Sequence, residues 1–342
     1  KVTSAARRLR LPASLAPGER TVEGERKRVM TEPSPTEPHR AEIDSAAAHW
    51  DRAFRDWASV EQQGSSYALA SPLYQKRYID RHFGADAPDW IEGLRRALKL
   101  EAPFENALAL GCGLGEGLLD LQRRGVAQRI HGIDISATAI EDARAAATRG
   151  GLAERVTFEV GDFHHCALAG GAYDLVLMIM SLHHALDLDA VLERVRAALK
   201  PGGLFVVNEY IGPNRWQHST VQLFLVNGLL RLLPRARRRK ADGSFKRSVG
   251  RPTVAAMLAM DPSEAAHSRE IPERFQHHFE LLHRVDYGGG IAVPVLDEII
   301  ANFGADERGG LAWFDWIVGI DRVARVTGLV PSANAFLVGR RK

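Results

Sequence analysis

The sequence predicts an α/β protein with a doubly wound, mostly parallel sheet, because short apolar runs alternate with helical patterns along much of the chain. The clearest unit lies at 107–121. There a short aliphatic run ends in four glycines at alternate positions, and leucines at helical spacing follow at once. A run this short and apolar is typical of a buried strand. Further strands are expected at 129–136, 156–160, 173–180, 199–210, 279–287 and 335–339, and helices at 137–149, 188–199, 291–303 and through Trp313 and Trp316.

The glycine turn between strand and helix predicts a ligand-binding loop. Glycine permits unusual backbone angles and removes the Cβ atoms that would hold a ligand away, and the following helix start offers unpaired N–H groups. A dinucleotide fingerprint needs its third glycine at the sixth position, where this chain has Glu116 or Leu118. The carboxylate of Glu116 would also repel a pyrophosphate. The loop therefore favours a nucleoside without phosphate.

An acid at the end of the second strand supports that ligand. Asp134 lies 21 residues beyond Gly113, which is the interval of one strand–helix–strand unit. An acid at this place usually accepts hydrogen bonds from the two ribose hydroxyls. We therefore expect the glycine turn and Asp134 to hold one nucleoside between them.

On this strand, turn and acid, the chain resembles the class I S-adenosylmethionine-dependent methyltransferases, whose first motif is a strand that ends in such a loop. The resemblance implies a Rossmann-like sheet of seven strands in the order 3-2-1-4-5-7-6, with the last strand antiparallel, and S-adenosyl-L-methionine as cofactor. One position departs from the family pattern. Members usually carry an acid two residues before the first glycine, where this chain has Ala109.

The resemblance also implies a set of cofactor contacts. Ile135 would lie beside the adenine. Asp162, in the GDF that follows the third strand, would accept from the adenine amine, and Phe163 would cover the ring. The full predicted set is Gly111, Cys112, Gly113, Gly115, Asp134, Ile135, Asp162, Phe163 and Met178.

Four parts of the chain are expected. Residues 1–40 form a disordered basic tail, and residues 41–100 a helical cap. The methyltransferase core comprises 101–213 and 277–342, and 214–276 is a helical basic insertion. In the cap, Tyr74 and Tyr78 either close over the methionine end of the cofactor or pack as ordinary aromatics. In the insertion, the DPSE that begins at Asp261 predicts a helix start, with Asp261 or Ser263 as the cap.

The positive charge of the chain is concentrated in two segments. The formal net charge is +3, but residues 1–40 carry +4 and residues 231–251 carry +8, which leaves the rest acidic. Three interpretations of the internal segment stay open: attraction of an anionic substrate, contact with an anionic membrane surface through 222–240, or a solvated loop. No run of 18 apolar residues occurs. Two cysteines give no disulfide framework and nothing resembles a secretory signal, so the expected location is the cytoplasm.

Candidate catalytic residues follow the fourth and fifth strands. A sulfonium methyl group is already activated, so the enzyme mainly supplies proximity, alignment and a partner for the departing proton. His184 or Glu209 is the candidate base, and Tyr210 lies beside them; His183 and Arg215 are candidate substrate contacts. A purely structural role for the histidine pair stays open. The segment EYIGPNRWQ with DPSE downstream resembles one subgroup of these methyltransferases, for which no uniform substrate is expected.

The predicted function is O-methylation of a small molecule or glycoconjugate. The alternatives are a non-catalytic scaffold that binds S-adenosylmethionine and a nicotinamide-dependent enzyme, which the glycine spacing disfavours. No nucleic-acid partner is expected, because SLHH follows the fourth strand in place of an NPPY-like element. No metal is predicted either, since neither histidine pair, His183 with His184 or His164 with His165 and Cys166, has the spacing of a known zinc motif. The acceptor and the oligomeric state stay open.

Overall fold

The computed structural model describes residues 39–62, 67–83, 89–100, 102–304 and 309–342. Residues 39–342 form one of two units of the chain, and the description below concerns this unit. Almost all of the predicted basic tail therefore lies outside the described residues, and the prediction of disorder there stays a prediction.

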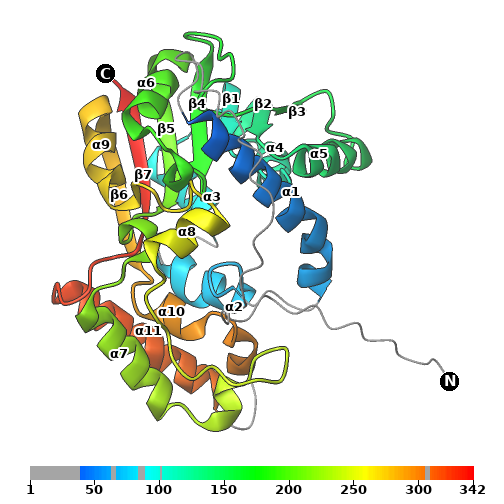
Figure 1. Cartoon of the computed structure of the whole chain (residues 1–342). Helices are drawn as coiled ribbons and strands as arrows, with labels where there is room; N and C mark the ends of the chain where they lie inside the picture. Colours follow the sequence, from blue (N-terminus) through cyan, green and yellow to red (C-terminus); the bar gives the residue numbers. More distant parts are fainter. Residues whose placement is uncertain (1–38, 63–66, 84–88, 101, 305–308) are drawn as a thin grey trace, which may run out of the picture. The chain divides into compact units, whose positions relative to one another are not determined.

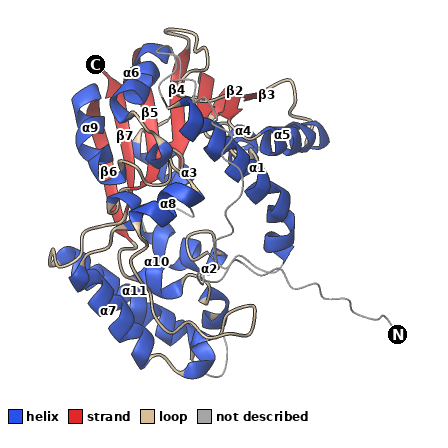
Figure 2. Ribbon diagram, viewed as in Figure 1, coloured by secondary structure: helices blue, strands red, loops and turns tan. Residues whose placement is uncertain are grey.

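A seven-stranded sheet organises the described chain, with the order β3-β2-β1-β4-β5-β7-β6 (Figures 1 and 2). The first five strands pair in parallel, and β7 runs antiparallel to both β5 and β6. The predicted fold class and strand order are thus confirmed. The strands are β1 Phe104–Leu110, β2 Ala127–Asp134, β3 Val156–Val160, β4 Tyr173–Ile179, β5 Leu199–Tyr210, β6 Phe279–Gly288 and β7 Asn334–Arg341.

Two hydrophobic cores cover the two faces of the sheet, because successive strand residues point to opposite sides. On β1, Ala107 and Ala109 belong to one core, whereas Leu108 and Leu110 belong to the other. The first core packs against α4 and α5, and the second against α6 and α9. These helices are α4 Glu116–Arg123, α5 Ala137–Arg149, α6 Leu188–Ala198 and α9 Ile271–His278. Asp187 caps the start of α6, since its carboxylate accepts from the Ala190 N–H at 3.0 Å.

The segment before β1 is helical, as expected, but it is divided into short pieces. After the long helix α1 Arg40–Gln62, Ser71 and Pro72 begin a sequence of tight turns that passes from α-helix to π-helix and 3-10 helix. The pieces are α2 Pro72–Tyr74, η1 Gln75–Ile79, η2 Asp80–Phe83 and α3 Trp90–Ala97.

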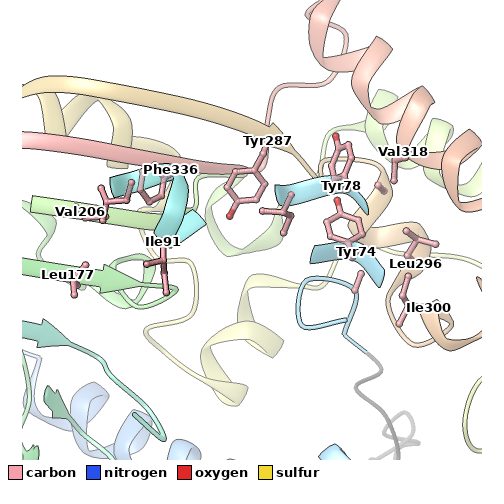
Figure 3. Close-up of a cluster of buried hydrophobic side chains, with 14 of the residues drawn as sticks. Tyr74, Tyr78, Ile91, Leu177, Val206, Tyr287, Leu296, Ile300, Val318 and Phe336 are labelled. Carbon is pink, nitrogen blue, oxygen red and sulfur yellow. The ribbon is translucent and has the colours of Figure 1, made fainter. Parts of the chain in front are cut away.

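Tyr74 and Tyr78 lie within the hydrophobic core (Figure 3). Tyr74 is fully buried and contacts the rings of Tyr78 and Phe314 edge to face. The Tyr78 hydroxyl donates to Asp321 at 2.6 Å. Of the two roles left open for these tyrosines, the structure therefore favours packing over closure above the cofactor.

Most remaining helices lie in or near the insertion, and Figure 1 shows α7, α10 and α11 grouped at one end of the sheet. Buried leucine and valine side chains of α7 belong to the first core together with Phe314, Ile317 and Val318 of α11. The elements are η3 Leu182–His184, η4 Asn214–Trp216, α7 Thr220–Leu232, η5 Arg235–Arg238, α8 Val254–Met260, η6 Ser268–Glu270, α10 Ala292–Leu296, η7 Ile300–Phe303 and α11 Gly310–Val326.

Two predicted helices are corrected. The helix expected over 291–303 is broken between α10 and η7, where Lys246 Nζ donates to the carbonyls of Pro294 and Asp297 at 2.7 Å each. A carbonyl that accepts from Lys246 does not need an N–H group of the next helical turn as its donor. The DPSE segment forms a turn instead of a helix start, with Asp261 Oδ1 accepting from the Ser263 N–H at 2.8 Å.

The basic segment 231–251 is only partly solvated. Arg237 and Lys246 are buried, and Lys240 pairs with Glu298 at 2.5 Å. Burial lowers the pKa of Lys246 to about 8. Part of the positive charge therefore fastens the insertion to the chain after β6. None of the helices described is long and apolar enough to cross a membrane.

Asp321 should be a principal stabiliser of the C-terminal part of the fold. Its buried carboxylate accepts from the Tyr78 hydroxyl and from the N–H groups of Gly289, Ile291 and Ala292, at 2.6 to 3.0 Å. Because Asp321→Ala leaves four buried donors unpaired, we expect it to lower the free energy of unfolding by about 3 kcal/mol or more in urea denaturation.

Asp315→Ala is the matched control, since Asp315 lies on the same helix but forms an exposed ion pair with Arg77. It should cost about 1 kcal/mol or less. Equal losses in the two variants would contradict this account of Asp321.

Candidate active site

The glycine loop joins the carboxyl end of β1 to α4. Gly111 and Gly115 have φ of 68° and 72°, in the left-handed region that favours glycine. A Cβ at Gly111 would lie 2.3 Å from the Cβ of Ser181, and one at Gly115 would lie 2.5 Å from the Phe158 ring. Any larger residue would therefore push the loop away from the neighbouring strands. The turn keeps its backbone close to the end of β4, where a ligand would meet both.

Asp134 connects this loop to the end of β2. Its Oδ2 accepts from the Gly113 N–H at 2.7 Å, and its Oδ1 accepts from the Ser136 N–H at 2.9 Å. The side chain is only 8% exposed, and burial raises the pKa of its carboxyl group. Each oxygen keeps a second lone pair. Asp134 can thus accept from a ribose hydroxyl while it holds the loop in place.

Asp51, in α1, is a site residue that the sequence analysis missed. Its Oδ1 accepts from the Ser136 hydroxyl at 2.6 Å and from the Thr138 N–H at 3.1 Å, so it caps the start of α5 from another helix. The same face of α1 carries Phe54, whose ring atom lies 3.4 Å from the place of a Cβ at Gly113. α1 therefore lies over the glycine loop. No local pattern marks Asp51, because its partners lie 85 and 87 residues away.

Asp162 follows β3 as expected, but it is engaged within its own loop. His165 Nδ1 lies 2.6 Å from its Oδ2. His164 Nε2 accepts from the Leu186 N–H at 3.1 Å, so Nδ1 carries the proton and donates to Asp162 Oδ1 at 2.7 Å. Burial raises the pKa of Asp162, but the bonds to the two histidines outweigh it and hold the pKa below its usual value. The predicted adenine contact would have to share this carboxylate.

The other predicted cofactor contacts differ in exposure. Ile135 and Phe163 are half-buried, and the Phe163 ring lies 4.6 Å from that of His164. Cys112 is partly exposed in the loop, and burial raises the pKa of its thiol. Met178 does not fit the prediction, because it is fully buried in the second core and has no free surface. Met180, two residues further along the chain, is 40% exposed with a φ of 54°.

Glu209 lies under the turn that follows β4. It is fully buried, and its carboxylate accepts from the N–H groups of Ser181, Leu182 and Tyr210 and from His183 Nδ1. These donors occupy the Glu209 carboxylate, and no part of the Glu209 side chain reaches the surface. This geometry suits a residue that positions the SLHH turn better than the base that was predicted.

The rings of the two histidines lie close together, with centroids 4.2 Å apart and planes tilted by 40°, and Trp50 of α1 contacts His184 edge to face with centroids 5.3 Å apart. Burial lowers the pKa of His183, but the charge of Glu209 and the hydrogen bond to it raise the pKa to about 9. Burial and the neighbouring His183 lower the pKa of His184 well below its usual value. Of the two predicted bases, His184 and Glu209, His184 is therefore the better placed.

The EYIGPNRWQ and DPSE segments meet over this turn. The Arg215 backbone N–H donates to the carbonyl of Ala265 at 2.7 Å, and its Nη1 donates to that of Pro262 at 2.5 Å. Arg215 is thus tied to the DPSE turn, and its predicted role in binding an anionic substrate stays a prediction. Tyr210 is largely buried and donates through its hydroxyl to the carbonyl of Pro213 at 3.2 Å. Burial raises the pKa of this hydroxyl.

DPSE adds Asp261, Ser263 and Glu264 to the site, and none of them was predicted as a site residue. Ser263 Oγ lies 3.0 Å from His184 Nδ1, and the Glu264 carboxylate lies 3.8 Å from Nε2 of each histidine. His183, His184 and Glu264 offer ligand atoms that all lie within 4.8 Å of one another. The DPSE resemblance was the one signal that could have pointed to them.

Comparison with known proteins identifies the class of the fold. Residues 107–203 match the family model for a methyltransferase domain. Over these residues the chain is thus similar to a methyltransferase domain, and its strand order is the one expected of the class I S-adenosylmethionine-dependent enzymes. S-adenosyl-L-methionine is the methyl donor of this class, which agrees with the predicted cofactor.

Three curated relatives are each similar over less than half of this chain. The methyltransferase GfsG of Streptomyces halstedii is 31% identical over 167 residues, covering 45% of this chain and 59% of that protein. The ubiquinone biosynthesis O-methyltransferase of Methylocella silvestris is 28% identical over 160 residues, covering 46% and 59%. Sterol 24-C-methyltransferase erg6 of Aspergillus fumigatus is 29% identical over 145 residues, covering 42% and 35%. The chain thus spans between about a third and three-fifths of the length of these relatives.

One solved structure supports the fold over most of the chain. Geranyl diphosphate C-methyltransferase from Streptomyces coelicolor is 16% identical, with a TM-score of 0.51 over 91% of this chain and 100% of that one. At this identity the likeness concerns the arrangement of strands and helices.

Asp134 provides a direct test of the cofactor site. Replacing it with alanine removes the predicted ribose contact and frees the Gly113 N–H, so we expect the affinity for adenosylhomocysteine to fall at least tenfold. A hydrogen bond to a charged group contributes about 1.5–3 kcal/mol, and about 1.4 kcal/mol corresponds to tenfold. Isothermal titration calorimetry measures this affinity.

Asp142→Ala is the control, because Asp142 is exposed on α5. It should bind adenosylhomocysteine as the unaltered protein does. An Asp134→Ala protein that keeps both its fold and full affinity would overturn the proposed cofactor site.

Proposed function

We propose that this protein transfers a methyl group from S-adenosyl-L-methionine to an oxygen of a small molecule or glycoconjugate. The observation that carries the proposal is the meeting of two sets of groups at the carboxyl ends of the parallel strands. The glycine loop and Asp134 follow β1 and β2, and a buried group of histidines and acids follows β4 and β5. Ligands of open α/β sheets bind at this edge.

The acceptor would approach from the side of β4 and β5. His183, His184 and Glu264 form a polar cluster there, which we call the His–Glu cluster. Methyl transfer to oxygen requires that the hydroxyl lose its proton as the new bond forms, and we assign the removal of that proton to this cluster. The sulfonium supplies the leaving group, so alignment of acceptor and methyl accounts for most of the remaining barrier.

The relatives do not indicate which atom accepts the methyl group, because they include both O- and C-methyltransferases. We infer an oxygen acceptor from the His–Glu cluster. A carbon or an unprotonated amine that attacks the methyl group has no hydroxyl proton to lose, so it does not need a buried imidazole for that purpose. A buried cluster with imidazole nitrogens directed at a carboxylate suits a hydroxyl nucleophile. If Arg215 binds the acceptor, label should appear in the acidic fraction of the extract and not in the neutral fraction.

Labelled S-adenosylmethionine, incubated with the purified protein and a fractionated small-molecule extract, tests this function. We expect label in a small-molecule fraction, as an ether or ester that survives chromatography. His184→Ala should reduce the rate about 100-fold or more, in the range for loss of a general acid–base group, while adenosylhomocysteine affinity stays within about twofold. His277→Ala, an exposed histidine on α9, is the matched control and should leave the rate unchanged.

Tight adenosylhomocysteine binding without any transferred label would contradict methyl transfer and favour the non-catalytic scaffold. Label that is found on nitrogen or carbon would keep the methyltransferase and reject the choice of oxygen.

A further inference from the structure

The three side chains of the His–Glu cluster converge on one point. Nε2 of His183 lies 3.8 Å from Glu264 Oε1, and Nε2 of His184 lies 3.8 Å from Glu264 Oε2. These separations are too long for hydrogen bonds. They are close to the spacing of ligands around a shared cation, because bonds of about 2.0–2.2 Å to a zinc ion separate tetrahedral ligand atoms by about 3.4 Å.

The opposite ring nitrogen of each histidine is already occupied. His183 Nδ1 donates to the buried Glu209 carboxylate at 2.5 Å. The Ser263 hydroxyl donates to Asp261 Oδ1 at 2.6 Å, so its oxygen accepts from His184 Nδ1 at 3.0 Å. Because Nδ1 of His184 carries the proton, its Nε2 presents a lone pair toward Glu264. Histidines that bind metals are oriented in this way, with the second nitrogen donating to a carboxylate or another acceptor.

The side chains around the His–Glu cluster carry more negative than positive charge. Three carboxylates lie close together here, those of Glu209, Asp261 and Glu264. Arg215 lies near them and is held by its hydrogen bond to the Pro262 carbonyl. Asp261 is 99% buried, yet its Oδ2 has no hydrogen-bond partner and lies 3.5 Å from His184 Nδ1. An unpartnered buried carboxylate oxygen is costly unless positive charge is near. A bound cation would provide that charge.

We propose that His183 Nε2, His184 Nε2 and the Glu264 carboxylate bind one divalent zinc ion, with Glu209 and the Ser263–Asp261 pair orienting the histidines. Two imidazoles and one carboxylate are a ligand set that zinc accepts in catalytic sites, where a fourth position stays open. The inference rests on the proposed function for the group at this fourth position, which would be an acceptor oxygen, either a hydroxyl or its deprotonated form. With zinc bound, His184 Nε2 would be a ligand and not the base, so a coordinated hydroxyl would lose its proton to solvent water. Its oxygen would then attack the methyl carbon as the carbon–sulfur bond breaks and adenosylhomocysteine leaves.

Metal binding to the full chain, first stripped with a chelator, tests the proposal without any assay of activity. Cobalt(II) titration followed by visible absorption reports coordination, and zinc competition gives the affinity. We expect one site per chain, with an absorption spectrum typical of four- or five-coordinate cobalt. Glu264→Gln and His184→Ala should each weaken binding at least 100-fold.

Glu273→Gln is the matched control, because Glu273 is an exposed carboxylate on α9, and it should bind within about twofold of the unaltered protein. Glu209→Gln should weaken binding about 10- to 100-fold without abolishing it, as expected for a group that orients a ligand. Thermal unfolding of each variant shows that the fold is kept.

Two results would overturn the metal site: no stoichiometric binding by the unaltered protein, or binding that Glu264→Gln leaves unchanged. Calorimetry with adenosylhomocysteine separates this failure from that of the proposed function. Cofactor binding without zinc binding would reject the metal alone, and zinc binding without cofactor binding would reject the methyl-transfer proposal alone.

Discussion

The bond from the Gly113 N–H to the Asp134 carboxylate is the contact on which the cofactor side of this protein depends. It joins the turn after β1 to the end of β2, so the two strands present one continuous surface. Asp134 also accepts from the Ser136 N–H, and the Ser136 hydroxyl donates in turn to Asp51 of α1. One short chain of hydrogen bonds thus links the glycine loop, α5 and the helix that lies over them.

A second buried carboxylate plays the corresponding part on the acceptor side. Glu209, at the end of β5, collects three backbone N–H groups and one imidazole from the turn after β4 and from its own strand. The DPSE turn then closes over the histidines and is held there by Arg215. Asp134 and Glu209 are therefore both acids at a strand end that fix a neighbouring turn.

Much of this arrangement could be predicted from local sequence, because local chemistry determines it. The apolar run before Gly111, the left-handed glycines and the cap at Asp187 each depend on residues close in the chain. The interval from Gly113 to Asp134 reflects the length of one strand–helix–strand unit. Sheet order followed from the resemblance to a known class and was confirmed by the structure.

The errors came where distant residues decide the outcome. Asp51 caps a helix 85 residues away, and Lys246 takes the carbonyls that a helix over 291–303 would need. Met178 was assigned to the cofactor because it lies near the carboxyl end of β4, but its side chain points into the second core and is fully buried. Glu264 joins the histidines only because two distant segments fold over one turn. Sequence periodicity contains no information on such contacts.

We expect one nucleoside to lie between the glycine loop and Asp134, under α1. A crystal structure of the protein with adenosylhomocysteine would test it most directly. We expect ribose hydroxyls within hydrogen-bond distance of Asp134 and the sulfur directed toward His184 and Glu264. A nucleoside bound elsewhere, or a ribose that makes no contact with Asp134, would contradict it.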